Sequence, residues 1–329
     1  MNDFGKLFKV GIFGESHQTS VGVLIDGIPA GIPLSVDDFL YDITRRKPQN
    51  SSETARVEDD LPLIESGLFN DHTTGAPMLI RFLNQNIRSN DYESLNNQPR
   101  PGHADFTAKV KFNGYNDYRG GGHTSGRVTL GLVAAGVIAK KIIPFTFKTE
   151  LVSLGTLSSL EKKDEYLEQI AQSGDSVGGI IRITVSKMII GLGEPYFYSA
   201  ESAISQILYS IGGIKGVSFG DGFAGISLLG SSFNDPIIDS NGKTATNHNG
   251  GINGGITNGN DLIINIFIKP TPSIYKEQAT FDFATNDIKP LCISGRHDSC
   301  IARRAMVVCE NAVAIALCDL FLIHRAYTK

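Results

Sequence analysis

The stretch ARRAMVVCENAVAIALCDLFLI, residues 302–323, decides the fold of this chain. As a helix it would make about six turns, and apolar side chains would lie on nearly all of its sides. A helix without a polar face has to be covered on opposite sides. We therefore predict that residues 302–323 form a buried helix in the middle of the molecule.

A second apolar stretch, VTLGLVAAGVIA at residues 128–139, has the same character. Ser125 precedes it and is a favoured N-cap, and the run continues through Ile143. Two such helices indicate a central helical layer. Because the strand-like segments are short and numerous, sheets on both faces are the natural cover for that layer.

The rest of the pattern predicts a mixed α and β chain in a single domain, residues 1–329. Strands are expected at residues 9–13, 21–26, 78–82, 180–185 and 262–268, most of them beside glycine or proline. A helix should begin at Ser35, and residues 162–174 have the pattern of an amphipathic surface helix. The largely polar stretch 231–259 is too long for an idle turn, and loops of that size are usually functional or disordered.

Composition excludes several classes of function. The chain has 30 basic and 34 acidic residues among 329, a net charge of -4, which argues against nucleic acid or an anionic membrane as partner. The start MNDFGK lacks the pattern of a secretion signal, and no apolar run without a charge is long enough for a membrane span, so we predict a cytoplasmic protein.

The cysteines do not predict a metal site. All four, Cys292, Cys300, Cys309 and Cys318, lie near the carboxyl end and are eight or nine residues apart. Zinc sites usually need pairs about two to four residues apart. We predict structural thiols and no metal.

Two histidines stand where a strand end or a turn could hold them for catalysis. His17 ends the stretch FGESH after the first strand, and His103 lies in RPGHAD, residues 100–105, where proline and glycine indicate a turn. Asp105 could orient the ring of His103 through a hydrogen bond. An imidazole titrates near neutral pH and so suits proton transfer. Each histidine alone is equally compatible with a structural role.

Two glycine-containing loops precede the two apolar helices. In RGGGHTSGR, residues 119–127, three glycines expose backbone N–H groups, which is typical of a phosphate or flavin cradle. The spacing is neither that of a Rossmann site nor that of a P-loop. The loop GRHDSCI, residues 295–301, opens onto the second helix and predicts an anion site at that helix N-terminus.

Basic side chains gather near these loops in sequence. Arg45, Arg46 and Lys47 close the helix that begins at Ser35, and Lys269 opens the stretch KPTPS, residues 269–273. A charge run is usually a solvated face. Guanidinium groups also bind carboxylates and phosphates through paired hydrogen bonds, so a site for a polyanion is the alternative.

These blocks, in this order, resemble the chorismate synthase family over essentially the whole chain. The stretches that carry the resemblance are GESH at 14–17, RRKP at 45–48, RPGHAD at 100–105, YRGGG at 118–122, GLGEP at 191–195, the glycine pairs at 250–251 and 254–255, KPT at 269–271 and GRHD at 295–298.

The resemblance implies a lyase that eliminates phosphate from 5-enolpyruvylshikimate 3-phosphate by 1,4-anti elimination, giving chorismate in the last step of the shikimate pathway. It implies reduced FMN that is needed but not consumed, and a homotetramer. The implied fold is α+β, a β-α-β sandwich with a central helical layer between antiparallel sheets. No segment looks like an added reductase domain, so we expect an external flavin reductant.

The resemblance also assigns residues to the site. His17 would protonate the departing phosphate, His103 would stabilise the anionic reduced flavin, and Asp298 would relay a proton from the flavin ring. The implied FMN contacts are His123, Thr124, Ser125, Gly212, Gly213, Gly254, Lys269, Pro270, Thr271, Pro272, Ser273 and Arg296. The implied contact to substrate anions is Arg46, and Arg45 and Arg127 are weaker candidates for the same role. In the family, these positions are alternatively contacts to a reduced nicotinamide.

The chain departs from the commonest family pattern at five places: Gln18 for glycine, His123 for arginine, Gly212-Gly213 for Asn-Ala, Pro272 for serine and Ser52 for an arginine. The polar contacts of the flavin and any nicotinamide site are therefore open at this stage. Two other functions also stay open: an FMN-dependent oxidoreductase that turns over a nicotinamide, and a non-catalytic module that binds an anion or nucleotide.

Overall fold

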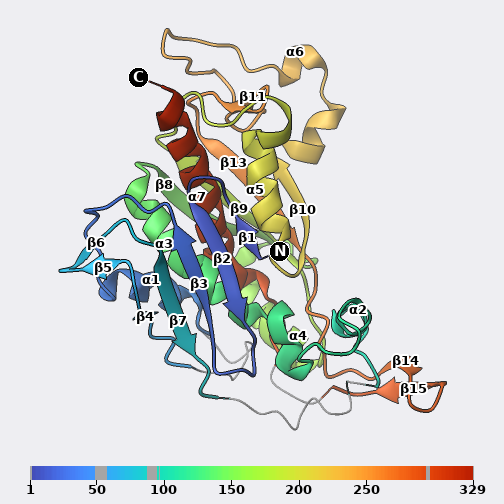
Figure 1. The fold of residues 1–329 in the computed structure, drawn as a ribbon. Helices are drawn as coiled ribbons and strands as arrows, with labels where there is room; N and C mark the ends of the chain where they lie inside the picture. The colour runs from blue at the N-terminus through green and yellow to red at the C-terminus, as the bar shows by residue number, and fades with distance from the viewer. Residues whose placement is uncertain (1, 49–57, 87–94, 96, 294–296, 329) are drawn as a thin grey trace.

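The computed structural model describes residues 2–48, 58–86, 95, 97–293 and 297–328 (Figure 1). It has the mixed helices and antiparallel sheets of an α+β protein, as the sequence predicts. The five predicted strands all form, as β2 (Lys9–Gly14), β3 (Ser20–Asp26), β7 (Met78–Leu83), β9 (Gly179–Ser186) and β13 (Leu262–Ile268).

The two apolar stretches form the helices at the centre of the molecule. The first is α3 (Leu130–Ile142), and the second is α7 (Ala302–Tyr327), which runs four residues beyond the predicted end at residue 323. Ten successive residues of α3 are buried, and so is every residue of α7 from Val307 to Leu320. The prediction of two helices covered on all sides is confirmed.

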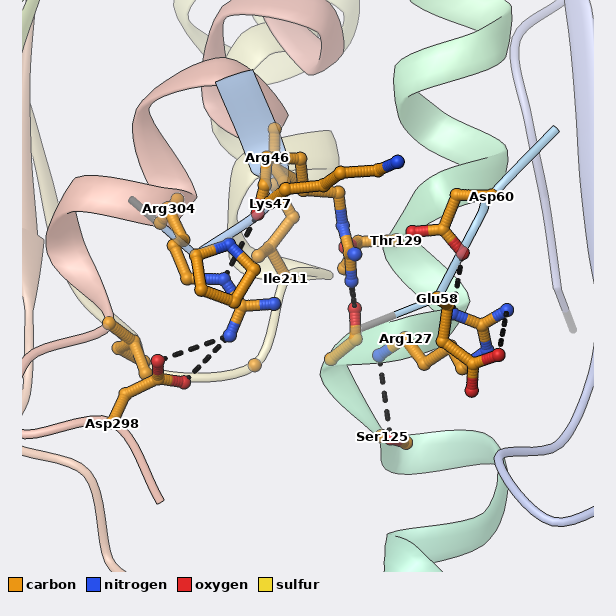
Figure 2. Close-up of a pocket in the computed structure, with 16 residues that line it drawn as sticks. Arg46, Lys47, Glu58, Asp60, Ser125, Arg127, Thr129, Ile211, Asp298 and Arg304 are labelled. Atoms are coloured by element: carbon orange, nitrogen blue, oxygen red, sulfur yellow. Dashed lines mark hydrogen bonds and ion pairs between the residues drawn. The ribbon is translucent and has the colours of Figure 1, made fainter. Parts of the chain in front are cut away.

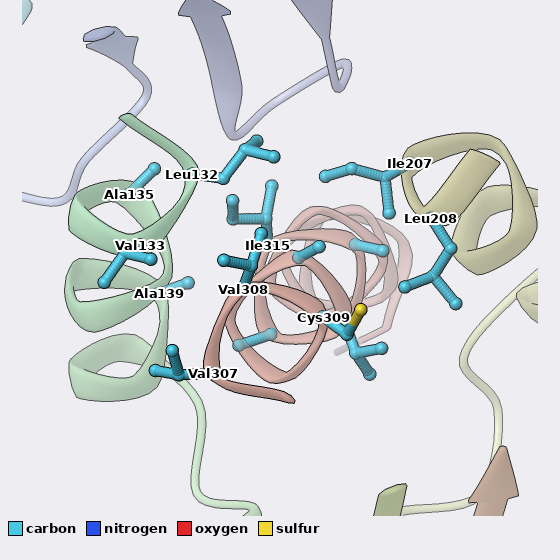
Figure 3. Close-up of a cluster of buried hydrophobic side chains, with 14 of the residues drawn as sticks. Leu132, Val133, Ala135, Ala139, Ile207, Leu208, Val307, Val308, Cys309 and Ile315 are labelled. Atoms are coloured by element: carbon cyan, nitrogen blue, oxygen red, sulfur yellow. The ribbon is translucent and has the colours of Figure 1, made fainter. Parts of the chain in front are cut away.

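Helices α3 and α7 cross in close contact. A Cβ atom on Gly136 of α3 would lie closer than 3.0 Å to Asn311 of α7, so the backbones could not approach this far if residue 136 had a side chain. On the other side of α7 lies α5 (Ala200–Tyr209), with Ile207 and Leu208 directed at it (Figure 3). The core of the protein is therefore built around α7.

A five-stranded sheet packs on α3. Its order is β1-β2-β3-β7-β4, with β1 at Asp3–Phe4 and β4 at Leu63–Ile64, and all pairs are antiparallel. Strands β2, β3 and β7 contact α3. Burial alternates along β7, as period-two strands with one covered face require.

A four-stranded sheet packs on α7 and α5. Its order is β10-β13-β9-β8, with β10 at Ile214–Phe219 and β8 at Thr146–Leu154. The register pairs Ile264 with Ile183 and Ile266 with Ile181, and these inward side chains are buried. Strands β8 and β9 contact α7, and β10 contacts α5. Helices α3 and α7 therefore touch one sheet each and also each other.

The predicted helix starts differ slightly from the observed ones. Helix α1 (Asp37–Arg46) begins just after Ser35, whose backbone N–H donates to the Asp38 carboxylate at 2.7 Å, one half of a capping box. Ser125 caps a 3-10 turn, η4 (Gly126–Thr129), by accepting the N–H of Arg127 at 3.4 Å, and α3 proper follows that turn. Residues 163–172 form the amphipathic surface helix α4 (Lys163–Gln172).

Strands β8 and β10 and helix α5 were not among the elements predicted. The long polar stretch 231–259 is mostly loop, with short elements at its ends. The remaining elements are β5 (Leu68–Phe69), β6 (His72–Thr73), α2 (Asp105–Lys111), η3 (Arg119–Thr124), η5 (Leu160–Lys162), η6 (Tyr196–Tyr198), η7 (Gly222–Ser227), α6 (Gly230–Phe233), β11 (Ile252–Asn253), β12 (Ile256–Thr257), β14 (Gln278–Asp282) and β15 (Asp287–Leu291).

The polar residues that interrupt α7 join it to distant segments. The carboxylate of Asp319 accepts the backbone N–H groups of Lys6, Leu7 and Phe8 at 2.7–3.0 Å and the hydroxyl of Tyr198. Burial, then the hydrogen bond to Asp319, raises the pKa of Tyr198 above its ordinary range. Asp319 thus fixes the amino-terminal segment against the central helix.

A second polar group lies where α1, α3 and β8 meet α7. Glu310 accepts from Arg45 at 2.7 and 2.9 Å, from Lys140 at 2.5 Å and from the Thr149 hydroxyl at 2.7 Å. Asp42 binds the same two cations at 2.7 and 2.9 Å. The two carboxylates and two cations compensate one another, which is the condition under which buried charge is tolerated.

By length and composition, α7 is the one helix in the described part of the chain that could cross a membrane, but 78% of its most apolar window is buried inside the molecule. It is a core helix. Cys300, Cys309 and Cys318 are buried while Cys292 is exposed, and burial raises the pKa of Cys309 to about 12. The described residues contain no group of three or more histidine, cysteine or acidic side chains placed to hold a metal ion.

We predict that Gly136→Ala lowers stability because it forces α3 and α7 apart. Overpacking of this kind costs about 1–3 kcal/mol. The free energy of unfolding, from urea denaturation, is the measurement. Gly230→Ala is the matched control, since a Cβ there would meet nothing within 4 Å. Equal stability of the two variants would contradict the close crossing.

Acid should remove the contribution of Glu310 to stability. Burial alone would raise its pKa, but the bonds from Arg45 and Lys140 outweigh burial and lower the pKa from its ordinary value of 4.5 to about 2. A depressed folded-state pKa means that the stabilisation is present above about pH 4.5 and is lost as the pH falls toward 2.

The measurement is the free energy of unfolding of the wild type and of Glu310→Gln between pH 7 and pH 2. The wild type should be more stable by about 3 kcal/mol at pH 7, and the difference should shrink as the pH falls. A difference that does not vary with pH would show that the charge of Glu310 contributes nothing.

Candidate functional site

A cavity of about 870 Å³ lies at the end of the core where α3 and α7 begin, beside the loops that precede these two helices. Its walls come from residues 2–4, the turn 102–104, residues 123–129 before α3, the end of α5 with residues 210–213, the segment 269–273, and Asp298 with Ile301 before α7. Stretches that are far apart in sequence therefore converge on one site.

Most of the predicted flavin contacts lie on this cavity. His103 and Asp298, two of the three predicted catalytic residues, line it as well. The flavin residues that it brings together are His123, Thr124, Ser125, Gly212, Gly213, Lys269, Thr271, Pro272 and Ser273. Pro270 belongs to the same segment but does not line the cavity, and Arg296 lies outside the described residues.

Gly254 is a predicted flavin contact that lies far from the cavity, because it is next to the amino-terminal end of α5 and the cavity is at the carboxyl end. It lies in the turn between β11 and β12, and the carbonyl of the next residue, Gly255, accepts the N–H of Ala200 at 2.8 Å. Ala200 begins α5, whereas the cavity is at the other end, ten residues on. A helix of that length spans about 15 Å. Within one chain, Gly254 is not part of this cavity.

A smaller cavity of about 260 Å³ adjoins the larger one and shares Ser125, Gly126, Thr129, Gly212 and Asp298 with it. Charged side chains line much of it. Figure 2 shows the basic side chains of Arg46, Lys47, Arg127 and Arg304 around one space, together with the carboxylates of Glu58, Asp60 and Asp298.

Arg46 is buried to the same extent as Arg127, with 7% of its surface exposed. Its guanidinium donates to the carbonyl of Gly126 at 2.6 Å and to the hydroxyl of Thr129 at 3.2 Å. Burial first, and then the nearby charges of Arg304 and Arg127, lower the pKa of Arg46 to about 9, although Asp60 and Asp298 act in the opposite direction. Arg46 is therefore a buried guanidinium without a carboxylate partner in hydrogen-bond contact among the described residues, and an anion in the cavity would stabilise its charge.

Arg127 lines the same cavity but is already neutralised. Its Nη1 binds the Asp60 carboxylate at 2.8 Å and its Nη2 donates to the carbonyl of Leu83 at 2.8 Å, while its Nε bonds to Asn84. Glu58 also lies within 4.0 Å. Arg127 therefore offers less free charge to a ligand than Arg46 does.

Arg45, predicted as a weaker candidate for a substrate contact, lines neither cavity. Its guanidinium is held by Glu310 and Asp42 in the polar group behind the helical layer. Successive residues of a helix point about 100° apart. Only Arg46 of the adjacent pair can face the cavity.

Arg304 lines the smaller cavity and was missed by the sequence analysis. Its Nη1 donates to both oxygens of Asp298, at 2.9 and 3.1 Å, and its Nε donates to the carbonyl of Arg46 at 3.0 Å. One signal was available: Arg304 lies in the first turn of α7, where the helix dipole disfavours a cation. A charge in an unfavourable place points to a ligand or a partner.

The predicted orientation of His103 by Asp105 is confirmed, with Nδ1 at 2.7 Å from the carboxylate. His123 is also held, since its Nδ1 lies 2.7 Å from the carbonyl oxygen of Gly14. His17 differs from both: it is 7% exposed and does not line either cavity.

The three-glycine loop lies between His17 and His103. A Cβ on Gly120 would come closer than 3.0 Å to Cε1 of His17, and a Cβ on Gly121 would lie 3.5 Å from Cε1 of His103. The two glycines have φ of 57° and 81°, a backbone conformation that residues with a Cβ atom rarely adopt. At Gly120 a side chain is excluded by His17, whereas at Gly121 a Cβ would make ordinary contact with His103 and the positive φ is what favours glycine.

The remaining reactive groups of the loop before α7 have structural surroundings. The ring of His297 packs on Tyr275 with centroids 5.4 Å apart, and Cys300 is buried with its pKa raised to about 11 by burial. At neutral pH that thiol stays protonated. In the described part of this loop, Asp298 and Ile301 line both cavities, and Asp298 is the one with a reactive side chain.

The chain was compared with known proteins. A family model described as chorismate synthase matches residues 8–322. The chorismate synthase of Chitinophaga pinensis is 53% identical over 325 residues, covering 99% of this chain and 98% of that protein. The chorismate synthase of Thermococcus gammatolerans is 41% identical and covers 98% of each chain. A solved structure titled "Crystal Structure of Chorismate Synthase" is similar in fold, with a TM-score of 0.74 at 24% identity over 97% of this chain and 93% of that one.

We predict that Gly120→Ala displaces the imidazole of His17 and destabilises the loop. The cost has two parts, a strained backbone of about 1–3 kcal/mol and the steric clash with the ring. Gly114→Ala is the matched control, because Gly114 has φ of 78° but a Cβ there meets nothing within 4 Å. The midpoint of thermal unfolding should fall further for Gly120→Ala than for Gly114→Ala. If the two variants lose the same amount, no contact with His17 is involved.

Proposed function

Because the chain belongs to the chorismate synthase family, we propose that its two adjoining cavities form one active site. The protein is a lyase that converts 5-enolpyruvylshikimate 3-phosphate into chorismate and phosphate by 1,4-anti elimination, the final step of the shikimate pathway. The observation that carries the site proposal is the convergence of His103, Asp298 and the cationic cavity on one space.

The larger cavity has the properties that the family's flavin requires. Its volume of about 870 Å³ lies within the range of about 300–1,000 Å³ that is typical of ligand sites. Its walls combine apolar side chains such as Ile207 and Leu132 with hydroxyls and with the amines of Lys215 and Lys269. We assign the apolar wall to the ring system and the two lysines to the phosphate of FMN. Reduced FMN, when bound, supplies an electron-rich ring that assists the elimination without net oxidation.

The smaller cavity suits the anions of the substrate. 5-Enolpyruvylshikimate 3-phosphate carries two carboxylates and a phosphate, and guanidinium groups bind both kinds of oxyanion in pairs. Arg46 and Arg304 are the cations that we assign to this task, with Lys47 beside them. The burial of Arg46 favours anion binding, because charge interactions are stronger where water is largely excluded.

Three residues are proposed to handle protons. His103 holds a proton beside the flavin, since its ring lines the larger cavity and is fixed by Asp105. Asp298 faces both cavities and is placed between the two ligands, which suits a proton relay. His17 donates a proton to the departing phosphate. Its ring is buried against Gly120 of the three-glycine loop, outside the lining of either cavity.

The full architecture that we propose is a single domain, residues 1–329, folded as a β-α-β sandwich. The contacts of α3 with one antiparallel sheet and of α7 with the other support this arrangement. A helical layer with a sheet on each face is also the simplest way to cover two helices that lack a polar side.

We also propose a homotetramer. Large apolar side chains are exposed around η6 and η7, including Phe197 at 96% and Ile226 at 86%. Exposed apolar surface of this kind marks protein contacts. Gly254 lies beside η6, because Gly255 packs against Glu194 and Ser199. The flavin contact assigned to Gly254 would then be made in the cavity of a neighbouring copy.

The supply of reduced flavin is assigned to an external reductant, and the location of the enzyme to the cytoplasm. Both proposals rest on the family rather than on a feature of the site. Whether a reduced nicotinamide binds depends in part on Ser52, which lies outside the described residues.

An anaerobic assay separates the lyase from the alternatives. With dithionite-reduced FMN and 5-enolpyruvylshikimate 3-phosphate, chorismate absorbance should rise and phosphate should be released in equal amount, while flavin stays catalytic. Consumption of a reduced nicotinamide in proportion to product would indicate an oxidoreductase. No product at all would indicate a binding module.

His17→Ala should lower turnover by about two to four orders of magnitude, the usual effect of removing a general acid. His17→Gln is the matched variant that keeps the size and polarity of the side chain but cannot donate a proton at neutral pH as an imidazolium can. Both should lose turnover while oxidised FMN still binds. Full activity in His17→Gln would assign His17 to packing against Gly120 instead.

A further inference from the structure

Two hydrogen bonds join the turn that carries His103 to the flavin-binding segment. Lys269 Nζ donates to the carbonyl of Gly102 at 2.6 Å, and Arg100 Nη1 donates to the hydroxyl of Ser273 at 3.1 Å. The turn 102–104 and the segment 269–273 both line the larger cavity. Arg100 itself is buried, with 6% of its surface exposed, and is not a cavity residue. Its role in the site is therefore indirect.

Arg100 grips the carboxylate of Asp105 with a fork of two bonds. Nε lies 2.7 Å from Oδ2 and Nη2 lies 2.8 Å from Oδ1, and the backbone N–H of Arg100 adds a third bond at 3.1 Å. Burial alone would raise the pKa of Asp105, but the bonds from Arg100 and His103 outweigh it and hold the pKa well below its ordinary range. Asp105 is therefore a fixed, ionised carboxylate.

The contact between Asp105 and His103 locates a proton. Nδ1 of His103 lies 2.7 Å from Oδ1 of Asp105, and an ionised carboxylate oxygen can only accept. If Nδ1 carried a lone pair, two acceptors would face each other at this distance. The proton must therefore be on Nδ1.

A competing contact is excluded by the same geometry. Nη2 of Arg100 lies 3.1 Å from Nδ1 of His103, and it could donate there only if Nδ1 were unprotonated. The Asp105 contact is shorter and joins the ring to a full negative charge, and charge-assisted hydrogen bonds are the stronger kind. Nη2 already has an acceptor in Oδ1 of Asp105.

We propose that Arg100 and Asp105 are positioning residues that keep a proton on Nδ1 of His103 and so leave Nε2 as the nitrogen that serves the cavity. The ring itself lines the larger cavity, and its Cε1 and Nε2 lie against the three-glycine loop, 3.5 and 3.7 Å from where a Cβ on Gly121 would be. This inference deepens the proposed function and rests on it, since it concerns the nitrogen with which His103 acts on the flavin.

Besides His103, the charged or titratable side chains on the cavity are Asp3, His123, Lys215, Lys269 and Asp298. Of these, Lys269 is tied to the His103 turn itself, through Gly102. Asp105 is the carboxylate in direct contact with the ring.

The first test is the tautomer of His103 in the full-length wild-type protein. Ring ¹⁵N shifts, with the His103 signals assigned by their loss in His103→Gln, should show the neutral ring protonated on Nδ1. Free histidine prefers the proton on Nε2, so the signature is distinctive. A neutral ring protonated on Nε2 would overturn the proposal without any variant of the turn being needed.

The second test is Asp105→Asn, which keeps the shape of the side chain and removes its charge. The ring ¹⁵N shifts of His103 should then show less of the form protonated on Nδ1, because the charged acceptor that holds this proton is gone, and turnover should fall while oxidised FMN still binds. An unchanged preference for the proton on Nδ1 would overturn the proposal.

Asp164→Asn is the control, since it also removes a carboxylate from an ion pair, the one with Arg303 at 2.8 Å, but at an exposed position that lines neither cavity. It should leave the ring ¹⁵N shifts of His103 and the turnover unchanged. A change of the His103 ring shifts in this control would overturn the proposal by showing a long-range effect. If Asp105→Asn changes the tautomer of His103 but not the turnover, the proton assignment stands and the proposed role of His103 in catalysis falls.

Discussion

The close packing of α3 against α7 is the contact on which the rest of the structure depends. Neither helix has a polar face, so α3 is covered by α7, by α1 and by one sheet, and α7 is covered by α3, by α5 and by the other sheet. The residues before both helices, Ser125 and Asp298 among them, line the same two cavities. Helix packing thus brings two loops that are about half the chain apart to one end of the core, where they form the site.

The structure separates charges that stabilise the core from charges that face ligands. Glu310 and Asp319 interrupt an apolar helix, yet each is satisfied by donors from several segments. Arg45 is neutralised in this way, whereas its neighbour Arg46 lies in a cavity among other cations. Adjacent arginines have different roles because successive side chains of a helix point about 100° apart. Arg45 therefore points to Glu310 and Asp42, and Arg46 points to the cavity.

Prediction from sequence worked best where a pattern is long and local. The central helices and five strands follow from runs of apolar residues at helical or alternating spacing. Helix α5 and strands β8 and β10 were not found, because short apolar segments are compatible with either conformation until the rest of the fold covers them. Among the site residues, His103 with Asp105 was found because a turn holds both, and Arg304 was missed because its partner Asp298 lies across a helix start.

The sequence by itself determined the class of the protein: two helices that have to be buried, strands to cover them, histidines in glycine-rich turns, and the order of motifs that identifies the family. Only the tertiary structure decided which of those residues meet. It placed Arg46 in the site and Arg45 outside it, moved Gly254 to the far end of α5, and put the three-glycine loop between His17 and His103. The physical reason is that local periodicity depends on neighbours in sequence, whereas a cavity depends on the angles and distances at which packed helices hold their loops.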